Sequence, residues 1–274
     1  MRQKFHREAR SRGSVDDKWK LSAAAGSYDQ FPDFNLMFGL FGNPALKSER
    51  ATVFNASIER LIGNRTRVLA EVYDRKESSL FFSLNEPRVA GTAVTFNGLP
   101  FQNSLNGYAR GFEITVQRRS ANKLAGWISY GYSRTKLTDG QDKINFVSDS
   151  DQRHTVNVYA NYRFTDTWNF SSEWRYGSGQ PVPGFFGRDS LGYFLVNQRN
   201  QTRLPYYSRV DVRLSKAFLF KKAKLTLTAE VLNLLNRNNV RYAGFERFFF
   251  DGRVQGQLQR VLPILPSAGI VIEF

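Results

Sequence analysis

The chain of 274 residues contains no cysteine and only two histidines. Without cysteine there can be no disulfide scaffold, no thiolate zinc site and no thiol nucleophile. Two isolated histidines also leave little material for a metal centre built on imidazole ligands. We therefore expect no catalytic residue, no cofactor-binding residue and no metal ligand, and we expect that the protein is not an enzyme.

Long hydrophobic runs are also missing, since no stretch approaches the ~18 apolar residues that a membrane-spanning helix requires. A helical membrane bundle is thereby excluded. Aromatic residues make up 15% of the chain, and this argues against intrinsic disorder, because disordered chains are poor in aromatics. Neither a nucleophile-elbow motif nor a phosphate-binding glycine motif occurs.

The dominant pattern is alternation of apolar and polar residues at period two. In residues 209–220, Val210, Val212 and Leu214 share one face, and Asp211 and Arg213 share the other. Such alternation predicts a strand that separates two environments. Most of the ten segments are longer than the usual ~5–6 residues and are long enough for the ~9–11 of a tilted membrane strand. The ten segments are 18–28, 49–61, 65–77, 107–119, 123–137, 153–165, 167–177, 208–220, 223–236 and 267–274.

The connections between these segments alternate strictly between short and long. The short ones lie at 62–64, 120–122, 165–166 and 221–222. The long ones are 29–48, 78–106, 138–152, 178–207 and 237–266. Outer-membrane barrels have this arrangement, with short periplasmic turns and long extracellular loops. A soluble sandwich has no reason to place all its long loops at one end.

The C-terminal residues resemble the assembly signal of bacterial outer-membrane barrels, in which a glycine and alternating hydrophobic residues precede a final aromatic residue. The matching positions are Gly269, Ile270, Ile272 and Phe274. Further segments, in the same order as in the family, resemble the barrel of TonB-dependent receptors of the Oar-like, carboxypeptidase-regulatory-like kind. They are residues 43–50, 106–113, 151–154, 176–181, 204–211 and 230–237.

This resemblance covers residues 15–274 and implies an all-β, transmembrane antiparallel β-barrel in a Gram-negative outer membrane. About ten strands of a probable 22 are expected, with the plug domain absent and residues 1–14 a basic leader that is not the native start. The implied partners are outer-membrane lipid, the barrel-assembly machinery, and the TonB complex through the missing plug. The implied activity is energy-coupled uptake of a scarce solute (siderophore, cofactor, glycan or peptide). A closed ten-strand barrel acting as a pore or hydrolase is the alternative.

The formal charge of +15 requires an explanation. Basic and aromatic residues interleave over 237–253, as they do in proteins that bind single-stranded nucleic acid. Charged residues that line a water-filled lumen and the loops explain the excess of positive charge better. We therefore expect no nucleic acid as a partner. A rim hydrolase could use His154 with Asp149 and Asp151, whereas an ordinary motif that opens a strand is the favoured interpretation. Alternation predicts that seven charged residues face the lumen: Glu113, Arg163, Glu173, Arg175, Asp211, Arg213 and Glu230.

Overall fold

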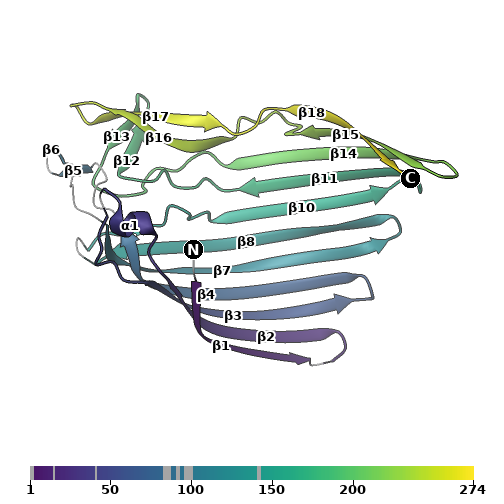
Figure 1. Ribbon diagram of the computed structural model, residues 1–274, viewed down its shortest axis with the longest axis horizontal. Helices are drawn as coiled ribbons and strands as arrows, with labels where there is room; N and C mark the ends of the chain where they lie inside the picture. Colours follow the sequence, from purple (N-terminus) through teal and green to yellow (C-terminus); the bar gives the residue numbers. More distant parts are fainter. Residues whose placement is uncertain are drawn as a thin grey trace.

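Antiparallel strands dominate the computed structural model, which describes residues 3–14, 16–40, 42–82, 88–90, 93–95, 101–140 and 143–274. One large sheet contains eleven long strands, each hydrogen-bonded to the next long strand in the chain (Figure 1). In spatial order they are β1 (Gln3–Ser14), β2 (Trp19–Gln30), β3 (Glu49–Ile62), β4 (Thr66–Phe82), β7 (Gln102–Ala121), β8 (Leu124–Asp139), β10 (His154–Arg163), β11 (Trp168–Gly177), β14 (Tyr207–Leu219), β15 (Lys224–Leu232) and β18 (Leu265–Glu273). The short β9 (Asn145–Val147) pairs with β8.

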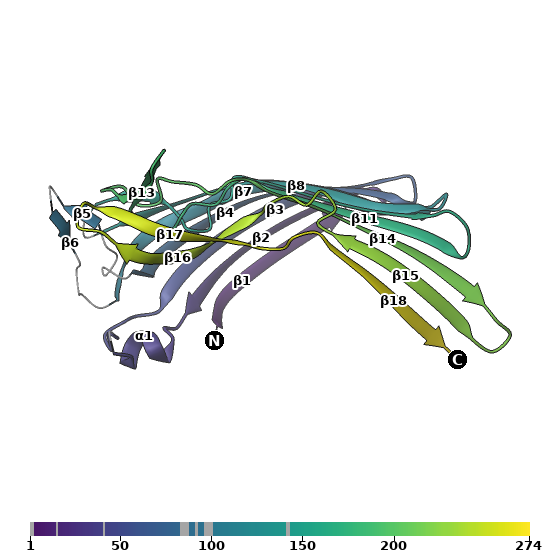
Figure 2. The ribbon, with the colours of Figure 1, turned by 90° about the horizontal axis from the view of Figure 1, so that it is seen from above.

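The sheet is arched but open. Strands β1 and β18 are the two ends of its order, and within the described residues no pairing joins them. Figure 2 shows the sheet as an arch whose first and last strands lie apart. The alternative of a closed ten-strand barrel is therefore wrong for this chain, and the large sheet fits the expected segment of a larger barrel.

All ten segments with alternating residues form long strands, and β1 is an additional one. It pairs with β2 over the region that the sequence suggested was a basic leader. The reason is that β1 has no apolar face: Ala9, Ser11 and Gly13 lie on one side, and Arg10 and Arg12 on the other. Its hydrogen bonds to β2, rather than side-chain hydrophobicity, define it as a strand.

The short turns and the long loops lie at opposite ends of the sheet, as the alternation of their lengths predicts (Figure 1). We call these the turn end and the loop end. At the turn end, Asn122 and Lys123 have φ of 50° and 67°, the left-handed pair that a two-residue hairpin requires. The loop end carries α1 (Phe34–Phe38), β5 (Arg88–Ala90), β6 (Ala93–Thr95), and a separate sheet of β12 (Phe186–Asp189), β13 (Gly192–Leu195), β17 (Arg253–Arg260) and β16 (Val240–Phe248).

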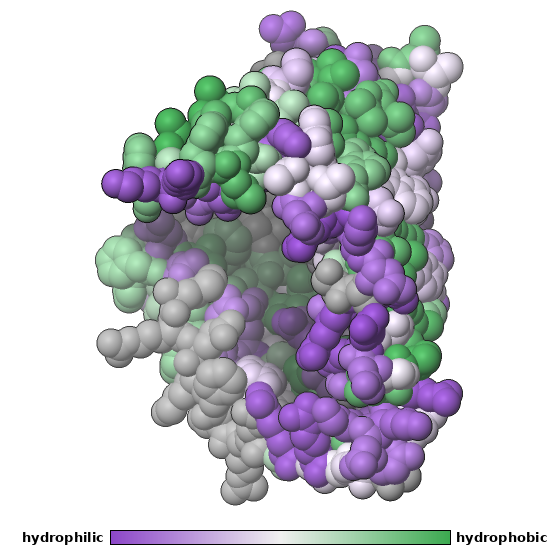
Figure 3. All heavy atoms as spheres, turned by 90° about the vertical axis from the view of Figure 1, so that its right-hand side faces the viewer, coloured by the Kyte–Doolittle hydropathy of each residue, from purple (hydrophilic) through white to green (hydrophobic). Residues whose placement is uncertain are grey.

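The large sheet has one face covered with exposed hydrophobic side chains, which we call the apolar face. Phe54, Ile128 and Ile270 are 50%, 45% and 69% exposed there. A soluble protein rarely leaves so much contiguous apolar surface in water. Hydrophobic atoms gather over the end of the sheet formed by β15 and β18, and the molecule is hollow when seen from the turn end (Figure 3). In the part of the chain that the structure describes, no helix is long and apolar enough to cross a membrane.

Aromatic side chains mark both ends of the apolar face. At the turn end, Phe164, Trp168 and Phe220 are exposed, and at the loop end Phe112 contacts the rings of Tyr130 and Tyr132. Two aromatic bands separated by aliphatic residues are typical of a barrel that spans a bilayer. The apolar face therefore has the length and composition of a surface that contacts lipid.

Candidate functional site

The seven charged residues that alternation assigns to the lumen all lie on one face of the sheet, opposite the apolar face. Strand register establishes this, because residues directly paired across strands point to the same side. Glu173 pairs with Asp211, and Arg213 pairs with Glu230. Followed from one strand to the next, the register places all seven residues on this face, which we call the polar face: Glu113, Arg163, Glu173, Arg175, Asp211, Arg213 and Glu230.

Two ion pairs on the polar face run along single strands, and each includes one or two of these seven residues. Arg175 Nε donates to Glu173 Oε1 at 2.6 Å, and Arg209 Nε donates to Asp211 Oδ1 at 2.7 Å. Glu113 accepts hydrogen bonds from Ser129 Oγ at 2.7 Å and Thr115 Oγ1 at 3.1 Å. These charges are therefore partly neutralised within the sheet and leave a hydrated, mixed-charge surface.

A buried carboxylate, Asp151, lies where the loop end meets the sheet. Its side chain is fully buried and accepts a hydrogen bond from Thr135 N at 2.8 Å. Arg153 Nε donates to the same carboxylate at 2.8 Å, and Arg203 Nη2 forms a second ion pair with it. Arg203 also donates to the carbonyl oxygen of Gly179 at 2.9 Å. Asp151 thus fixes the long loop 178–206 to strand β8.

A second aspartate, Asp149, lies two residues before Asp151 and holds the same loop. Arg199 binds the two carboxylate oxygens of Asp149 with both terminal nitrogens, and Asn200 Nδ2 donates to Oδ1 at 2.7 Å. The guanidinium of Arg199 lies over the rings of Phe82 and Phe146, 5.5 and 5.0 Å from their centroids. An arginine stacked and bidentately bound in this way is difficult to replace with lysine.

Burial alone would raise the pKa of the Asp151 carboxyl group, but the Thr135 N–H and the guanidinium groups of Arg203 and Arg153 outweigh it and hold the pKa below its usual value. A lowered folded-state pKa stabilises the loop above the unfolded value of about 3.9, and this contribution is lost as the pH falls through the folded pKa. We predict that amide protection in residues 178–206, corrected for intrinsic exchange, is constant from about pH 7 to 5 and falls below about pH 4. In Asp151→Asn this acid step should vanish.

Asn233 closes the loop between β15 and β16. It is fully buried with φ of 51°. Its Nδ2 donates to the carbonyls of Arg237 and Leu262 at 3.0 and 2.7 Å, and its Oδ1 accepts from Arg237 N at 3.2 Å. Its backbone N–H also donates to Asp211 at 2.8 Å. The asparagine therefore joins three parts of the chain at a position where most side chains are strained.

We predict that Asn233→Ala lowers the free energy of unfolding by about 2–3 kcal/mol, since three hydrogen bonds of about 1 kcal/mol each are lost and alanine is strained at positive φ. Guanidinium unfolding of the protein in detergent micelles would measure this. Asn122, an exposed asparagine with φ of 50° in the turn between β7 and β8, provides the control, because the same backbone strain is introduced there without the loss of buried hydrogen bonds. Equal losses in Asn233→Ala and Asn122→Ala would contradict the role assigned to the buried amide.

A pocket of about 460 Å³ opens between loop 178–206 and the β16–β17 hairpin. Its polar lining comes from Gln152, Gln180, Tyr207 and Arg241, and Asp149 lies at its edge. Prolines at 181, 183 and 205 stiffen the wall, because each proline fixes its own φ. The pocket therefore has a rigid outline with hydrogen-bond donors and acceptors facing its interior.

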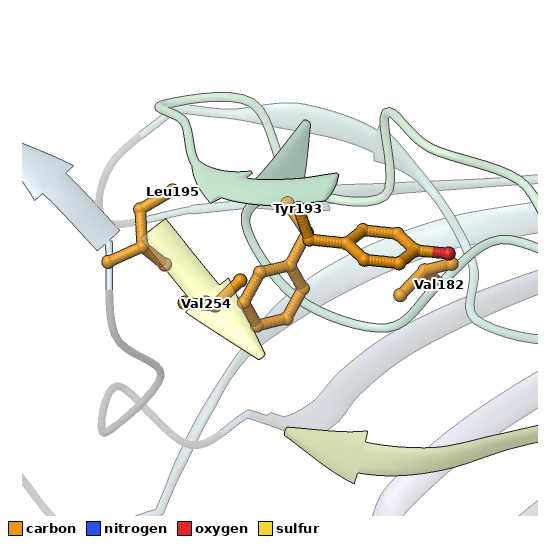
Figure 4. Close-up of a cluster of buried hydrophobic side chains, with 5 residues drawn as sticks. Val182, Tyr193, Leu195 and Val254 are labelled. Atoms are coloured by element: carbon orange, nitrogen blue, oxygen red, sulfur yellow. The ribbon is translucent and has the colours of Figure 1, made fainter. Parts of the chain in front are cut away.

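An apolar cluster supports this pocket from the loop side. Val182, Phe186, Tyr193, Leu195 and Val254 are buried together, with Leu204 and Tyr242 packed against them. Figure 4 shows the ring of Tyr193 extending toward Val182, with Val254 from β17 close by. Leu204 and Tyr242 line the pocket as well, so the cluster positions one of its walls.

His154 and the basic segment 237–253 both have partners within the chain. His154 Nδ1 lies 2.9 Å from the Tyr130 hydroxyl, and its ring contacts Tyr132, so it does not form a dyad with Asp149 or Asp151. In the basic segment, Arg253 pairs with Asp189 at 2.8 Å. Among the described residues, no three histidine, aspartate or glutamate side chains gather as metal ligands would.

Three residues of this site carry no signal in the sequence. Arg199 and Arg203 lie about fifty residues from their aspartate partners, and Arg241 lies in a segment that the sequence pattern assigned to an irregular loop. Nothing in local spacing connects such distant positions. Only the doublet Asp149 and Asp151, beside His154, hinted at a charged cluster here.

Similarity to known proteins gives the fold its context. The sequence model of the family described as TonB dependent receptor-like, beta-barrel matches residues 12–234. No curated protein matches the chain in sequence. Among solved structures, the unliganded ferric citrate transporter FecA superposes with a TM-score of 0.68 and 12% identity, covering 97% of this chain and 38% of its own.

Two more structures are similar. The ferripyoverdine receptor of the outer membrane of Pseudomonas aeruginosa gives a TM-score of 0.64 with 11% identity, over 97% of this chain and 32% of the receptor. The FrpB iron transporter from Neisseria meningitidis gives 0.60 with 15% identity, over 97% and 38%. The chain thus spans less than two fifths of these proteins. Because the family match covers most of the sequence, the chain belongs to the TonB-dependent receptor-like β-barrel family and is a segment of an outer-membrane barrel.

Proposed function

We propose that this chain forms part of the barrel wall of a receptor that takes up a scarce solute across the outer membrane with energy supplied through TonB. The family match is the observation that carries the proposal. The separation of one hydrated, charged face from one apolar face supports it, because a barrel wall must divide a watery lumen from lipid. On this proposal the polar face lines the lumen, and Glu113, Glu173 and Asp211 are among the residues that a passing solute meets.

The solute is expected to bind first at the loop end. The pocket between loop 178–206 and β16–β17 lies there, and Gln180 and Arg241 offer donors to a polar solute. Asp149 and Asp151 hold the loop in place, so the pocket is formed before a ligand arrives. A siderophore, cofactor, glycan or peptide would each find hydrogen-bonding partners and a stiff wall in this pocket.

A deletion strain tests the proposal. Cells without the complete gene should fail to grow under only one nutrient limitation. The conditions to compare are limiting iron, cobalamin, a glycan nutrient and a peptide nutrient. The complete gene should restore growth, and dissipation of the proton-motive force should abolish uptake again. Normal growth of the deletion strain in every condition would argue against a transport role, as would restored uptake that persists without TonB.

The barrel wall alone should not transport actively. Energy passes to receptors of this family through the plug, so cells that express only residues 1–274 are expected to show no energy-dependent uptake. Radiolabelled solute, once identified, measures this directly. Active accumulation by such cells would contradict the assignment of these residues to the wall.

A further inference from the structure

The apolar face changes abruptly to a basic surface at the loop end of β4, β7 and β8. Along β7, Val116, Ile114 and Phe112 on this face are followed by Arg110. Along β8, Ile128, Tyr130 and Tyr132 are followed by Arg134. Strand register places these residues in two rows across three adjacent strands. The first row is Asp74, Arg110 and Arg134, and the second is Lys76, Tyr108 and Lys136.

We call Lys76, Arg110, Arg134 and Lys136 the outer basic patch. Arg110 and Arg134 pair directly, which places their Cβ atoms ~4.5–5.5 Å apart. Lys76 and Lys136 lie on either side of Tyr108 in the next row, so the four cations lie within three adjacent strands. The aromatic contacts of Phe112 with Tyr132, at 5.8 Å between ring centroids, lie one row toward the turn end. Since aromatic residues mark the level of lipid headgroups, the patch lies at that level on the loop side.

The patch carries excess positive charge that the described residues do not balance. Arg110 Nε donates to Asp74 Oδ1, and its guanidinium lies 4.3 Å from the ring centroid of Tyr108. Among the described residues, no ion-pair partner is found for Lys76, Arg134 or Lys136. Arg134 and Lys136 are neighbours on one face of β8, and Lys76 lies in the row of Lys136 on the far side of β7. Like charges repel one another, and an anion from outside the chain would relieve that repulsion.

We propose that the outer basic patch binds the phosphate groups of a phosphorylated glycolipid in the outer leaflet of the membrane. The acyl chains of this lipid would lie on Phe112, Ile114 and Ile128, which continue the same face toward the turn end. The guanidinium of Arg134 and the ammonium groups of Lys76 and Lys136 would bind phosphate oxygens through charge-assisted hydrogen bonds. A lipid fits because it offers an anionic head and an apolar body side by side, as the face does.

This site is separate from solute passage, because it lies on the side of the sheet opposite Glu113 and Glu173. Its ligand therefore belongs to the surrounding membrane and not to the lumen. Binding would fasten β4, β7 and β8 to the outer leaflet at the height where the loops begin. The proposal can fail while the transport role holds, and the reverse is also true.

The test measures lipid binding by the purified protein in detergent micelles with native mass spectrometry. The probes are bisphosphorylated lipid A and the same lipid with both phosphates removed. Wild type is expected to bind the phosphorylated lipid at least about tenfold more tightly, since several charge pairs of a few tenths to 1 kcal/mol each act together. The triple variant Lys76→Gln, Arg134→Gln, Lys136→Gln, which keeps the Arg110–Asp74 pair, should lose this preference.

The matched control is Arg65→Gln, Lys221→Gln, Lys222→Gln, which removes three exposed cations at the turn end and should keep the preference. The heat-dependent shift in gel mobility checks that each variant is folded. If the triple variant does not fold, the single variant Arg134→Gln replaces it and is expected to lose part of the preference. Equal binding of both lipids by wild type would overturn the proposal. So would an equal loss in the control, or displacement of the lipid by millimolar inorganic phosphate, which would indicate a site for small anions.

Discussion

Replacing Asp151 with alanine is expected to release loop 178–206 from the sheet. The change removes the carboxylate from Arg153, Arg203 and the N–H of Thr135. Breaking a buried ion pair costs about 3–5 kcal/mol, and because both arginine side chains are about a third exposed, solvent reduces this to about 2–3 kcal/mol. Local opening of the loop should then become roughly 30-fold more frequent or greater.

Trypsin cleavage within residues 178–206, timed by mass spectrometry, measures this opening. Arg188 is exposed in that region and provides a cleavage site whenever the loop detaches. The matched control is Asp166→Ala, an exposed aspartate in the turn between β10 and β11. Comparable cleavage rates in Asp151→Ala and Asp166→Ala would show that the buried carboxylate does not hold the loop.

The strands of this protein were largely predictable because a barrel wall places different solvents on its two faces. That difference imposes alternation on each strand, as Val210 to Leu214 illustrate on β14. β1 was missed because neither of its faces is apolar: small residues such as Ala9 and Ser11 lie on one face, and Arg10 and Arg12 lie on the other. The β16–β17 hairpin was missed because its register shifts between Tyr242 and Phe245 and again before Arg247, which breaks the period of two.

The candidate site was predictable only where it follows the strands. Alternation placed Glu113, Arg175 and Asp211 on one face, and register agrees. The ion pairs at the loop end follow no period, because the path of a long loop brings Arg199 to Asp149 and Arg203 to Asp151. Contacts across about fifty residues depend on tertiary structure alone, so the pocket beside Arg241 could not be foreseen.

The two faces of the sheet divide the roles between them. On the polar face, ion pairs such as Arg209–Asp211 keep charges hydrated and partly neutralised, which suits a surface that solutes pass. On the apolar face, Arg110 and Arg134 follow the aromatic residues of the loop end along β7 and β8.

The largest effect in cells is expected from Phe274→Ser. Ile270 and Ile272 lie on the apolar face opposite Leu227 and Leu225, and Phe274 follows them fully exposed. We propose that the barrel-assembly machinery binds this exposed ring. Burying a phenylalanine in a partner contributes about 1.5–3 kcal/mol, so its loss should lower the folded, heat-modifiable protein in the outer membrane about tenfold or more. Phe250→Ser removes an equally exposed phenylalanine at the loop end and should leave that amount unchanged. Equal loss in both variants would mean that surface hydrophobicity, and not the C-terminal aromatic residue, directs assembly.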